Sequence, residues 1–201
     1  NYISGFTSGV ISNRSVIKIR LTETYNKAKI NEKADQNLFD FTPDIEGEAY
    51  WLDNQTIEFR PSENLPSGKL FDAKFYLSKL MTVPKKLKTL DFQFQVLKQA
   101  VEVDFLGMES MDKEDLKWQI INGNVLTYDF AESENLESSF KAYQDGEELF
   151  VRWEHASGGK THQFVIDSVQ RTKNRKQVIL QWNGKKLGFD HESEKVFEIP
   201  P

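Results

Sequence analysis

Short runs of alternating apolar and polar residues, separated by turn residues, are the feature that most constrains how this chain can fold. In residues 49–68, AYWLDNQTIEFRPSENLPSG, apolar Ala49, Trp51 and Phe59 alternate with polar neighbours. A period of two is typical of strands that bury one face. Residues 53–55 supply a turn between the two runs, because Asp and Asn tolerate the backbone angles of tight turns. This stretch predicts a β-hairpin.

A second turn and a third alternating run follow the hairpin. Pro61 has no backbone donor, so we expect strand pairing to end there. Residues 65–68, Leu-Pro-Ser-Gly, form a turn signal, because Pro presets one dihedral angle and Gly accepts a positive one. The alternation resumes over 70–78. We expect these three strands to form one antiparallel sheet.

The first half of the chain has the number of strands that is typical of an immunoglobulin-like sandwich, with turn signals between them. The polar segments 24–36 and 77–87 are expected to hold helical turns at the crossings between sheets. The expected strands are 8–11, 15–22, 38–42, 47–52, 56–60, 70–78 and 90–97.

The second half repeats the strand-and-turn pattern without repeating the sequence. Turns are expected at Asn122-Gly123, at 157–159 and at Asn183-Gly184. Leu136, Phe140 and Tyr143 recur at helical spacing behind Ser133, a possible cap, and predict one short helix over 133–143. The expected strands are 100–106, 115–121, 125–129, 148–153, 161–167, 177–182 and 194–199.

The two halves meet near residues 97–100 with almost no linker. The sequence therefore predicts an all-β chain of two tandem Ig-like antiparallel β-sandwiches, residues 1–98 and 99–201, with a short helix in the second.

Composition excludes several classes of function. The 201 residues contain no cysteine, so a thiol nucleophile, a Cys-ligated zinc and a disulfide are all excluded within the chain. The net charge of -5 argues against a nucleic-acid surface. We interpret the basic stretches 171–176 and 85–88 as solvated turns. No apolar run is long enough for a membrane span.

Motifs for chemistry are scarce. In RWEHASGGKTHQF, His155 and His162 lie on either side of a hairpin turn beside Glu154, and two imidazoles could ligate zinc or copper. The spacing places no third ligand. No nucleophile elbow, phosphate loop or His-Glu-x-x-His motif is present. The acidic pairs Glu132/Glu134 and Glu147-Glu148 are expected to be solvated. We therefore expect no catalytic, cofactor-binding or metal-binding residue, and no enzyme.

The aromatic residues divide into expected core and candidate surface. Trp118, Trp153 and Trp182 fall on the apolar phase of their strands, which predicts that all three are core residues. A row of exposed aromatic side chains would instead favour sugar binding. Tyr25, Tyr128 and Tyr143 are loose candidates for such a row.

Both halves carry a resemblance to a known family. The strand that ends in Phe41-Thr42-Pro43, the Tyr50-Trp51 strand, the exit Phe59-Arg60-Pro61 and the turn at 65–68 are similar to the amino-terminal region of bacterial alpha-2-macroglobulins of the Bacteroidetes type. In the second half, DLKWQIINGNV, VRWEHASGGKTHQFVIDSVQR and VILQWNGKKLG resemble the following domain of the same proteins.

The resemblance implies two macroglobulin-like sandwiches near the front of a large exported protein that traps attacking proteases. Its members are typically periplasmic or attached to the cell envelope, often through a lipid on an upstream cysteine. The implied partners are the other domains of the parent chain and, for the parent, proteases. The chain starts at Asn1 and ends in Pro200-Pro201, so we expect it to be a piece of such a protein. An Ig-like adhesin or carbohydrate-binding module of a bacterial surface protein remains the alternative.

Overall fold

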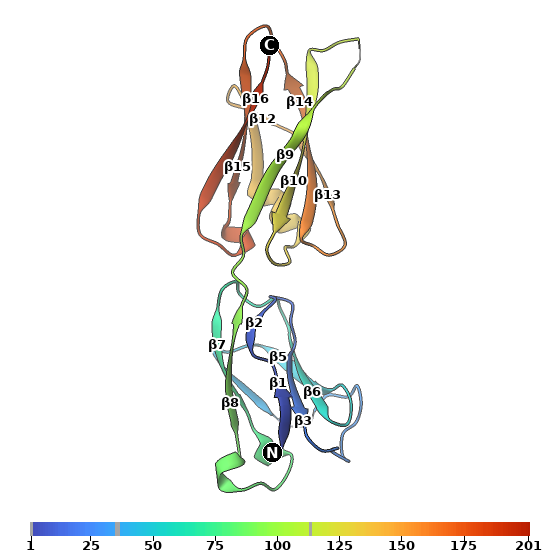
Figure 1. Cartoon of the computed structure of the whole chain (residues 1–201), viewed down its shortest axis with the longest axis vertical. Helices are drawn as coiled ribbons and strands as arrows, with labels where there is room; N and C mark the ends of the chain where they lie inside the picture. Colours follow the sequence, from blue (N-terminus) through green and yellow to red (C-terminus); the bar gives the residue numbers. More distant parts are fainter. Residues whose placement is uncertain (1, 35–36, 113) are drawn as a thin grey trace. The chain divides into compact units, whose positions relative to one another are not determined.

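The chain folds into two compact units, each built from short β-strands. The computed structural model describes residues 2–34, 37–112 and 114–201. The units are Asn1–Leu97, here unit 1, and Lys98–Pro201, here unit 2 (Figure 1). Each has its own buried core. Among the described residues, no helix is long and apolar enough to cross a membrane.

Unit 1 consists of two four-stranded sheets with the orders β1-β3-β6-β5 and β2-β8-β7-β4. Neighbouring strands are antiparallel, except that β2 runs parallel to β8. With β1 and β2 as the two parts of a split first strand, this is the strand order of an immunoglobulin-like fold. The strands are β1 Ile3–Phe6, β2 Gly9–Ile11, β3 Ile17–Leu21, β4 Phe39–Thr42, β5 Gly47–Trp51, β6 Thr56–Pro61, β7 Leu70–Phe75 and β8 Leu90–Val96.

The core of unit 1 is rich in phenylalanine. Phe41 of β4 and Phe59 of β6 belong to opposite sheets, and their ring centroids are 4.8 Å apart. Phe71 and Phe94 stack on neighbouring strands at 5.3 Å. Tilted and offset ring pairs are each worth about 0.5–1.5 kcal/mol beyond the area they bury. Aromatic pairs such as Phe41–Phe59 therefore help to hold the two sheets face to face, together with the aliphatic side chains of the same core.

The predicted hairpin at 49–60 is confirmed. Asp53 Oδ1 accepts hydrogen bonds from the backbone N–H groups of Gln55 and Thr56, both at 2.7 Å, so one carboxylate organises the turn between β5 and β6. These backbone bonds hold the pKa of Asp53 below its usual value. The expected single sheet of three strands is wrong, because β7 pairs with β4 and β8 in the other sheet. The turn at 65–68 crosses between the sheets.

The polar segments between strands differ from each other. Segment 77–87 does hold helical turns, η1 Leu77–Lys79 and η2 Lys85–Leu87, both 3-10 helices. No helix is present among the described residues of 24–36. Ile30 and Lys33 instead make isolated bridges to Trp51 and Tyr50 at the edge of β5. The first strand, β1, has no counterpart in the prediction, because it is short and only partly buried.

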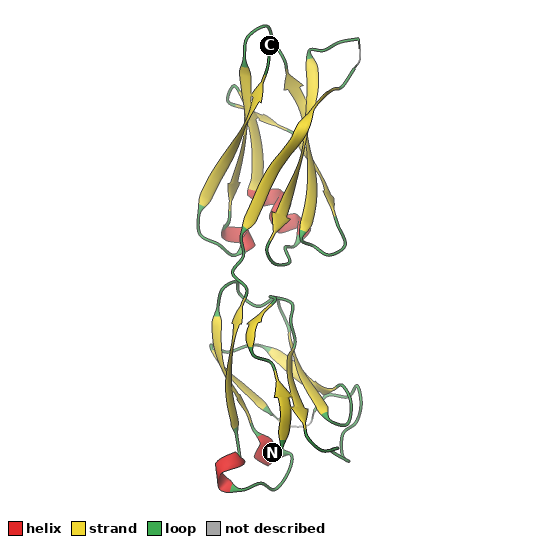
Figure 2. Ribbon diagram, viewed as in Figure 1, coloured by secondary structure: helices red, strands yellow, loops and turns green. Residues whose placement is uncertain are grey.

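Unit 2 also has two four-stranded sheets, with the orders β13-β14-β10-β9 and β12-β11-β15-β16. All the pairings in it are antiparallel. It too has an immunoglobulin-like strand order, with a short helix before the third strand (Figure 2). Its elements are β9 Val101–Ser110, β10 Trp118–Thr127, α1 Ser133–Ser139, β11 Phe140–Gln144, β12 Glu147–Leu149, β13 Val151–His155, β14 Thr161–Gln170, β15 Lys176–Asn183, η3 Lys185–Leu187 and β16 Glu192–Ile199.

Asn122-Gly123 is not a turn, which corrects the prediction. The expected strands 115–121 and 125–129 are one continuous strand, β10, paired with β9 and β14 on its two sides. A side chain at Gly123 would place its Cβ atom 2.1 Å from the Phe164 ring. The glycine therefore permits close packing of that ring, and it does not mark a change of chain direction.

The predicted helix over 133–143 is shorter in the structure, where it ends at Ser139. Glu132 is the N-cap residue, with no side-chain capping bond, and Ser133 is the first helical residue rather than the cap. Phe140 has extended dihedral angles, φ -111° and ψ 139°, and begins β11. Phe140 and Ala142 are both buried on one face, so period two applies where period 3.6 was expected. The expected strand 148–153 is likewise two strands, β12 and β13, in different sheets.

The prediction for the three tryptophans holds for two of them. Trp153 and Trp182 are partly buried and pack against the core of unit 2. The prediction for Trp118 is wrong, because its side chain is 39% exposed. In β10 the buried positions are the odd-numbered ones from Gln119 onward, so Trp118 lies on the outer face of the sheet. The prediction divided β10 into two strands, 115–121 and 125–129, and therefore did not reveal that its odd-numbered residues are the buried ones.

Replacing Trp51 should show how strongly unit 1 depends on its aromatic core. Trp51 is 4% exposed, and its ring stacks on Tyr25 with centroids 5.0 Å apart. We expect Trp51→Ala to lower the free energy of unfolding of unit 1 by about 3–5 kcal/mol. Trp118→Ala, at an exposed ring of unit 2, is the control and should lower the free energy of unfolding of unit 2 by no more than about 0.5 kcal/mol. Chemical denaturation measures both, and an unchanged midpoint for Trp51→Ala would contradict the packing.

Candidate functional site

Two histidines and a glutamate form a hydrogen-bonded cluster of titratable side chains in unit 2. His155 on β13 and His162 on β14 are directly paired across the hairpin. Their Nδ1 atoms are 2.8 Å apart, and His155 Nε2 is 2.8 Å from Glu137 Oε1 on α1. The sequence predicted that the imidazoles would be close, but it did not place Glu137 beside them. Contact between a helix and a hairpin depends on tertiary packing, which leaves no local pattern.

Burial sets the electrostatics of this cluster. His162 is fully buried, whereas the His155 side chain is 17% exposed. Burial lowers the pKa of His162 below its usual value, the neighbouring His155 lowers it further, and a weaker interaction with the backbone of Gly159 acts in the opposite direction. His162 Nε2 is buried without a hydrogen-bond partner among the described residues. A neutral His162 is therefore favoured in the folded unit.

The geometry favours a hydrogen-bonded pair over a metal centre. No group of three or more His, Asp or Glu side chains suited to a metal ion occurs in the part of the chain that the structure describes. The two facing nitrogens of His155 and His162 already share a hydrogen bond, and Glu137 bonds to the outer nitrogen of His155. Glu154, the neighbour noted in the sequence, is exposed on the other phase of β13. The expectation that no metal is bound stays a prediction.

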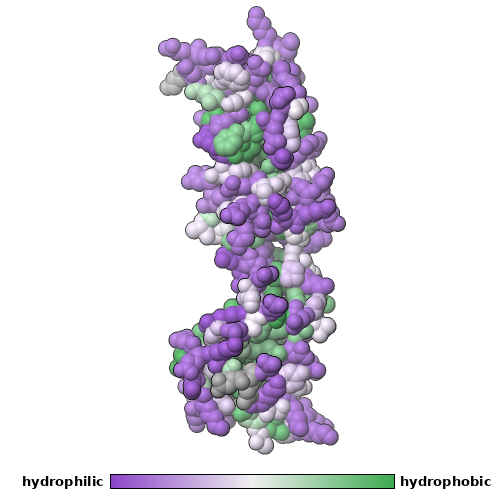
Figure 3. Space-filling view, turned by 180° about the vertical axis from the view of Figure 1, so that it is seen from behind, coloured by the Kyte–Doolittle hydropathy of each residue, from purple (hydrophilic) through white to green (hydrophobic). Residues whose placement is uncertain are grey.

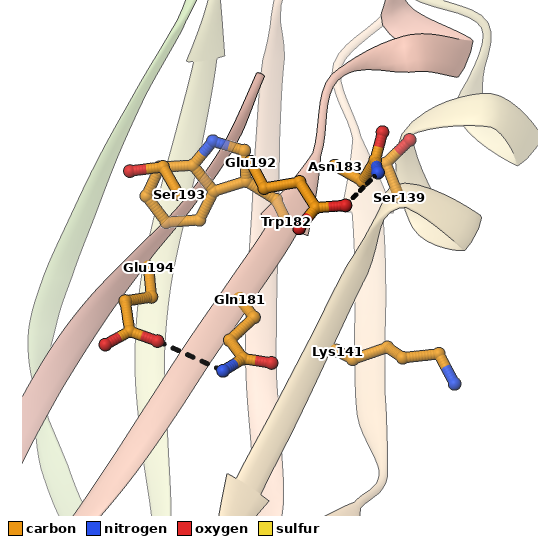
Figure 4. Close-up of a pocket in the computed structure, with 8 residues that line it drawn as sticks. All are labelled: Ser139, Lys141, Gln181, Trp182, Asn183, Glu192, Ser193 and Glu194. Carbon is orange, nitrogen blue, oxygen red and sulfur yellow. Dashed lines mark hydrogen bonds between the residues drawn. The ribbon is translucent and has the colours of Figure 1, made fainter. Parts of the chain in front are cut away.

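A groove of unit 2, with a volume of ≈ 400 Å³, lies over the sheet that contains β11, β15 and β16. Figure 4 shows its side chains, among which Gln181 bonds to Glu194 and Asn183 bonds to Glu192. The groove is lined by Ser139, Lys141, Gln181, Trp182, Asn183, Glu192, Ser193 and Glu194.

The chemistry of this groove is that of a paired polar surface. Its amide side chains donate hydrogen bonds to its carboxylates, and Lys141 forms an ion pair with Glu148. Trp182 Nε1 is buried without a partner among the described residues. The groove could accept a small polar molecule, but the side chains that line it do not present a nucleophile beside a general base.

The outer face of the sheet β13-β14-β10-β9 carries exposed apolar side chains. Trp118 and Leu126 of β10 are 39% and 43% exposed, and Leu106 at a bulge in β9 is 65% exposed. Trp118 is also covered by Lys117, whose Nζ atom is 5.0 Å from the ring centroid. An apolar sheet face is a candidate contact surface. Seen from behind, unit 2 also shows a hydrophobic patch within its hydrophilic surface, and this view does not label the residues of the patch (Figure 3).

The three tyrosines proposed as a sugar platform do not form one. Tyr25 stacks on Trp51 in unit 1, and it contributes to that core. Tyr128 is 47% exposed and donates a hydrogen bond to Glu102 at 2.9 Å, which raises the pKa of its hydroxyl. Tyr143 lies in the other sheet of unit 2, on β11. The structure brings none of these rings side by side.

Hydrogen bonds tie the chain into its own unit on both sides of the boundary. Leu97 N–H donates to Ile11 O at 2.8 Å in unit 1. Gln99 is 3% exposed in unit 2, where its Nε2 donates to Asp129 O at 3.0 Å and its Oε1 accepts from Asp129 N at 2.9 Å. Lys98 alone separates the two anchored residues. Sequence reasoning missed Gln99, although it occupies the apolar phase of Val101.

Comparisons with known proteins are limited to solved structures, because no family model and no curated protein matches the chain. Bovine butyrophilin is similar in structure, with 8% identity over 98% of this chain and 96% of that chain, and a TM-score of 0.37. The titin Ig tandem domains A164-A165 are 9% identical over 99% of this chain and 96% of that chain, with a TM-score of 0.31. Titin A168169 is 5% identical over 97% of this chain and 94% of that chain, with a TM-score of 0.31. The Ig-like fold of this chain rests on the strand order of each unit.

Proposed function

We propose that this chain is a non-catalytic scaffold segment of a larger exported protein of the alpha-2-macroglobulin type, which traps proteases. The observation that carries the proposal is the boundary. Two complete Ig-like sandwiches follow each other with only Lys98 between residues that are hydrogen-bonded into their own units. A one-residue connection restricts motion far more than a flexible linker does.

The residues that carry the family resemblance support this proposal. They build the structural parts of the fold. The Tyr50-Trp51 strand is β5, Phe59-Arg60-Pro61 ends β6, and the turn at 65–68 connects the two sheets of unit 1. In unit 2, DLKWQIINGNV covers the start of β10. The matching residues form core and turns rather than a reactive site, which fits domains that hold other parts of the proposed parent in place.

The chemistry of a protease trap would lie elsewhere in the parent. A reactive thioester needs a cysteine, and these 201 residues have none. The partners of this segment are then the other domains of the parent chain, with proteases as targets of the whole protein. Export to the periplasm or the cell envelope, with a lipid on an upstream cysteine, belongs to the same proposal.

The native protein that contains this chain tests the proposal. An antibody raised against residues 1–201 would isolate it from the cell envelope, and its intact mass would be measured before and after brief exposure to a protease. We expect a chain many times heavier than 23.3 kDa that is cut within one segment and retains the protease. A native chain of about the same mass, or one that is simply degraded, would refute the proposal.

The exposed outer face of unit 2 favours a second function, that of an Ig-like adhesin or carbohydrate-binding module. Trp118 was expected in the core, and its ring lies at the surface. Aromatic faces at the surface are common contacts for sugars and for partner proteins. This second function does not need a large parent protein.

A glycan array distinguishes the second function from the first. If the outer face of β10 binds sugars, the isolated chain should give reproducible hits that Trp118→Ala reduces at least about tenfold, which is the loss of about 1.4 kcal/mol. Gln181→Ala, in the groove of the opposite sheet, is the matched control and should retain them. An array without hits for the unmodified chain would exclude this function for the glycans tested.

A further inference from the structure

We propose that His155, His162 and Glu137 form an acid-sensitive latch at the end of the β13–β14 hairpin, in which the contact between the two rings opens on protonation while Glu137 of α1 holds His155. The three side chains come from three elements and are joined by two hydrogen bonds of 2.8 Å. The helix itself is also held by Leu136, which is fully buried in the core of unit 2, and by the bond from Lys186 to Ser138 at 3.0 Å. The latch therefore couples protonation to the closure of the hairpin end.

The neutral latch fixes which nitrogens carry protons. The Glu137 carboxylate only accepts, so His155 Nε2 is the donor of that bond. While both imidazoles are neutral, His155 Nδ1 is then an acceptor, and His162 must carry its proton on Nδ1. The remaining nitrogen, His162 Nε2, then carries no proton, and its lone pair is buried without a hydrogen-bond partner among the described residues. The geometry thus sets one tautomer for each ring.

The first proton can be accommodated. If His155 becomes an imidazolium, its charge is balanced by Glu137, and its Nδ1–H can donate to His162 Nδ1 after His162 changes tautomer. The hydrogen bond between the two Nδ1 atoms is kept, and His155 becomes its donor in place of His162. The proton of His162 then lies on Nε2, which makes no hydrogen bond among the described residues and has only a weak interaction with the Gly159 backbone, so this state gains less from the bond than its charge pairing suggests.

The second proton breaks the latch. When both rings are imidazolium, two Nδ1–H groups face each other where the nitrogens are now 2.8 Å apart, and one of the two charges is fully buried. Neither group can accept, and like charges repel strongly in a dry site. Separation of the rings relieves the repulsion and opens the end of the hairpin, whereas the ion pair between His155 and Glu137 is kept.

The surrounding charges do not replace Glu137. Lys141 of β11 is paired with Glu148, and Arg152 of β13 is paired with Asp167. Glu134 of α1, Glu154 of β13 and Lys160 of the hairpin turn are exposed, and Asp129 after β10 is buried and bonds to the Phe130 backbone. Among the described residues, Glu137 is the carboxylate in hydrogen-bond contact with the pair.

The direction of the pH effect follows from the lowered pKa of His162. In the unfolded chain a histidine titrates near about 6.5, whereas burial lowers the pKa of His162 in the folded unit. Between these two values the unfolded chain binds more protons. The contribution of His162 to stability is therefore complete above about pH 6.5 and is lost as the pH falls toward the folded-state pKa.

Melting curves of the whole chain between pH 8 and pH 5 test the latch. We expect the midpoint of unit 2 to be constant above about pH 6.5 and to fall below it, and His162→Phe, which cannot be protonated, to remove that fall. Glu137→Gln keeps an acceptor but removes the charge that balances a protonated ring in the folded unit, so the fall should begin at the same pH and be steeper. Glu134→Gln, on the same helix but away from the pair, is the control and should behave like the unmodified chain.

Nitrogen NMR of the histidine rings provides a measurement that does not depend on a variant folding. At pH 8 we expect His155 as the Nε2–H tautomer and His162 as the Nδ1–H tautomer. Acidification should change the shifts of both rings together with the amide signals at the end of the β13–β14 hairpin. Both rings titrating independently near about pH 6.5, or a fall in melting midpoint that persists in His162→Phe, would overturn the proposal. So would stabilisation by added zinc, because it would assign the pair to a metal.

Discussion

Inter-sheet packing of apolar side chains is the constraint on which the rest of this structure depends. The chain has no cysteine, so no disulfide can close either sandwich. Each unit is closed by side chains that alternate along its strands, with fully buried Phe75 and Phe94 in unit 1 and Phe164 and Ile166 in unit 2. Burial of a side chain of this size contributes about 1.5–3 kcal/mol. The fold therefore depends on alternation in central strands such as β3 and β8.

Where alternation is broken, the exceptions have physical causes. Gly123 leaves room for the Phe164 ring, and Gln99 occupies an apolar phase because its side chain bonds to the Asp129 backbone. His162 is buried at an apolar phase because His155 satisfies its Nδ1 atom. Buried polar residues thus tie unit 2 together at the boundary and at the latch, and Gln144 does the same through its bonds to the Gln170 backbone.

Sequence reasoning predicts most of the strands, because period two in short runs is a local signal. The hairpin around Asp53 and the turn at 65–68 are examples, since their turn chemistry is contained in adjacent residues. It fails where a non-local contact decides. The ring of Phe164 decides the role of Gly123, and strand pairing ends α1 before Phe140. Of the candidate cluster, the histidine pair is visible in the sequence, whereas Glu137 is not.

The account of the function depends on the two units acting as one stiff segment, and the connection through Lys98 is what makes that possible. Because the chain lacks cysteine, Gln93→Cys and Gln163→Cys place one spin label on an exposed strand position of each unit. The most direct test is the distribution of distances between these labels, measured by pulsed electron spin resonance. The account predicts one narrow distribution, which broadens after Gln99→Ala or after insertion of Gly-Ser repeats beside Lys98. A distribution that is already as broad in the labelled chain without these changes would contradict it.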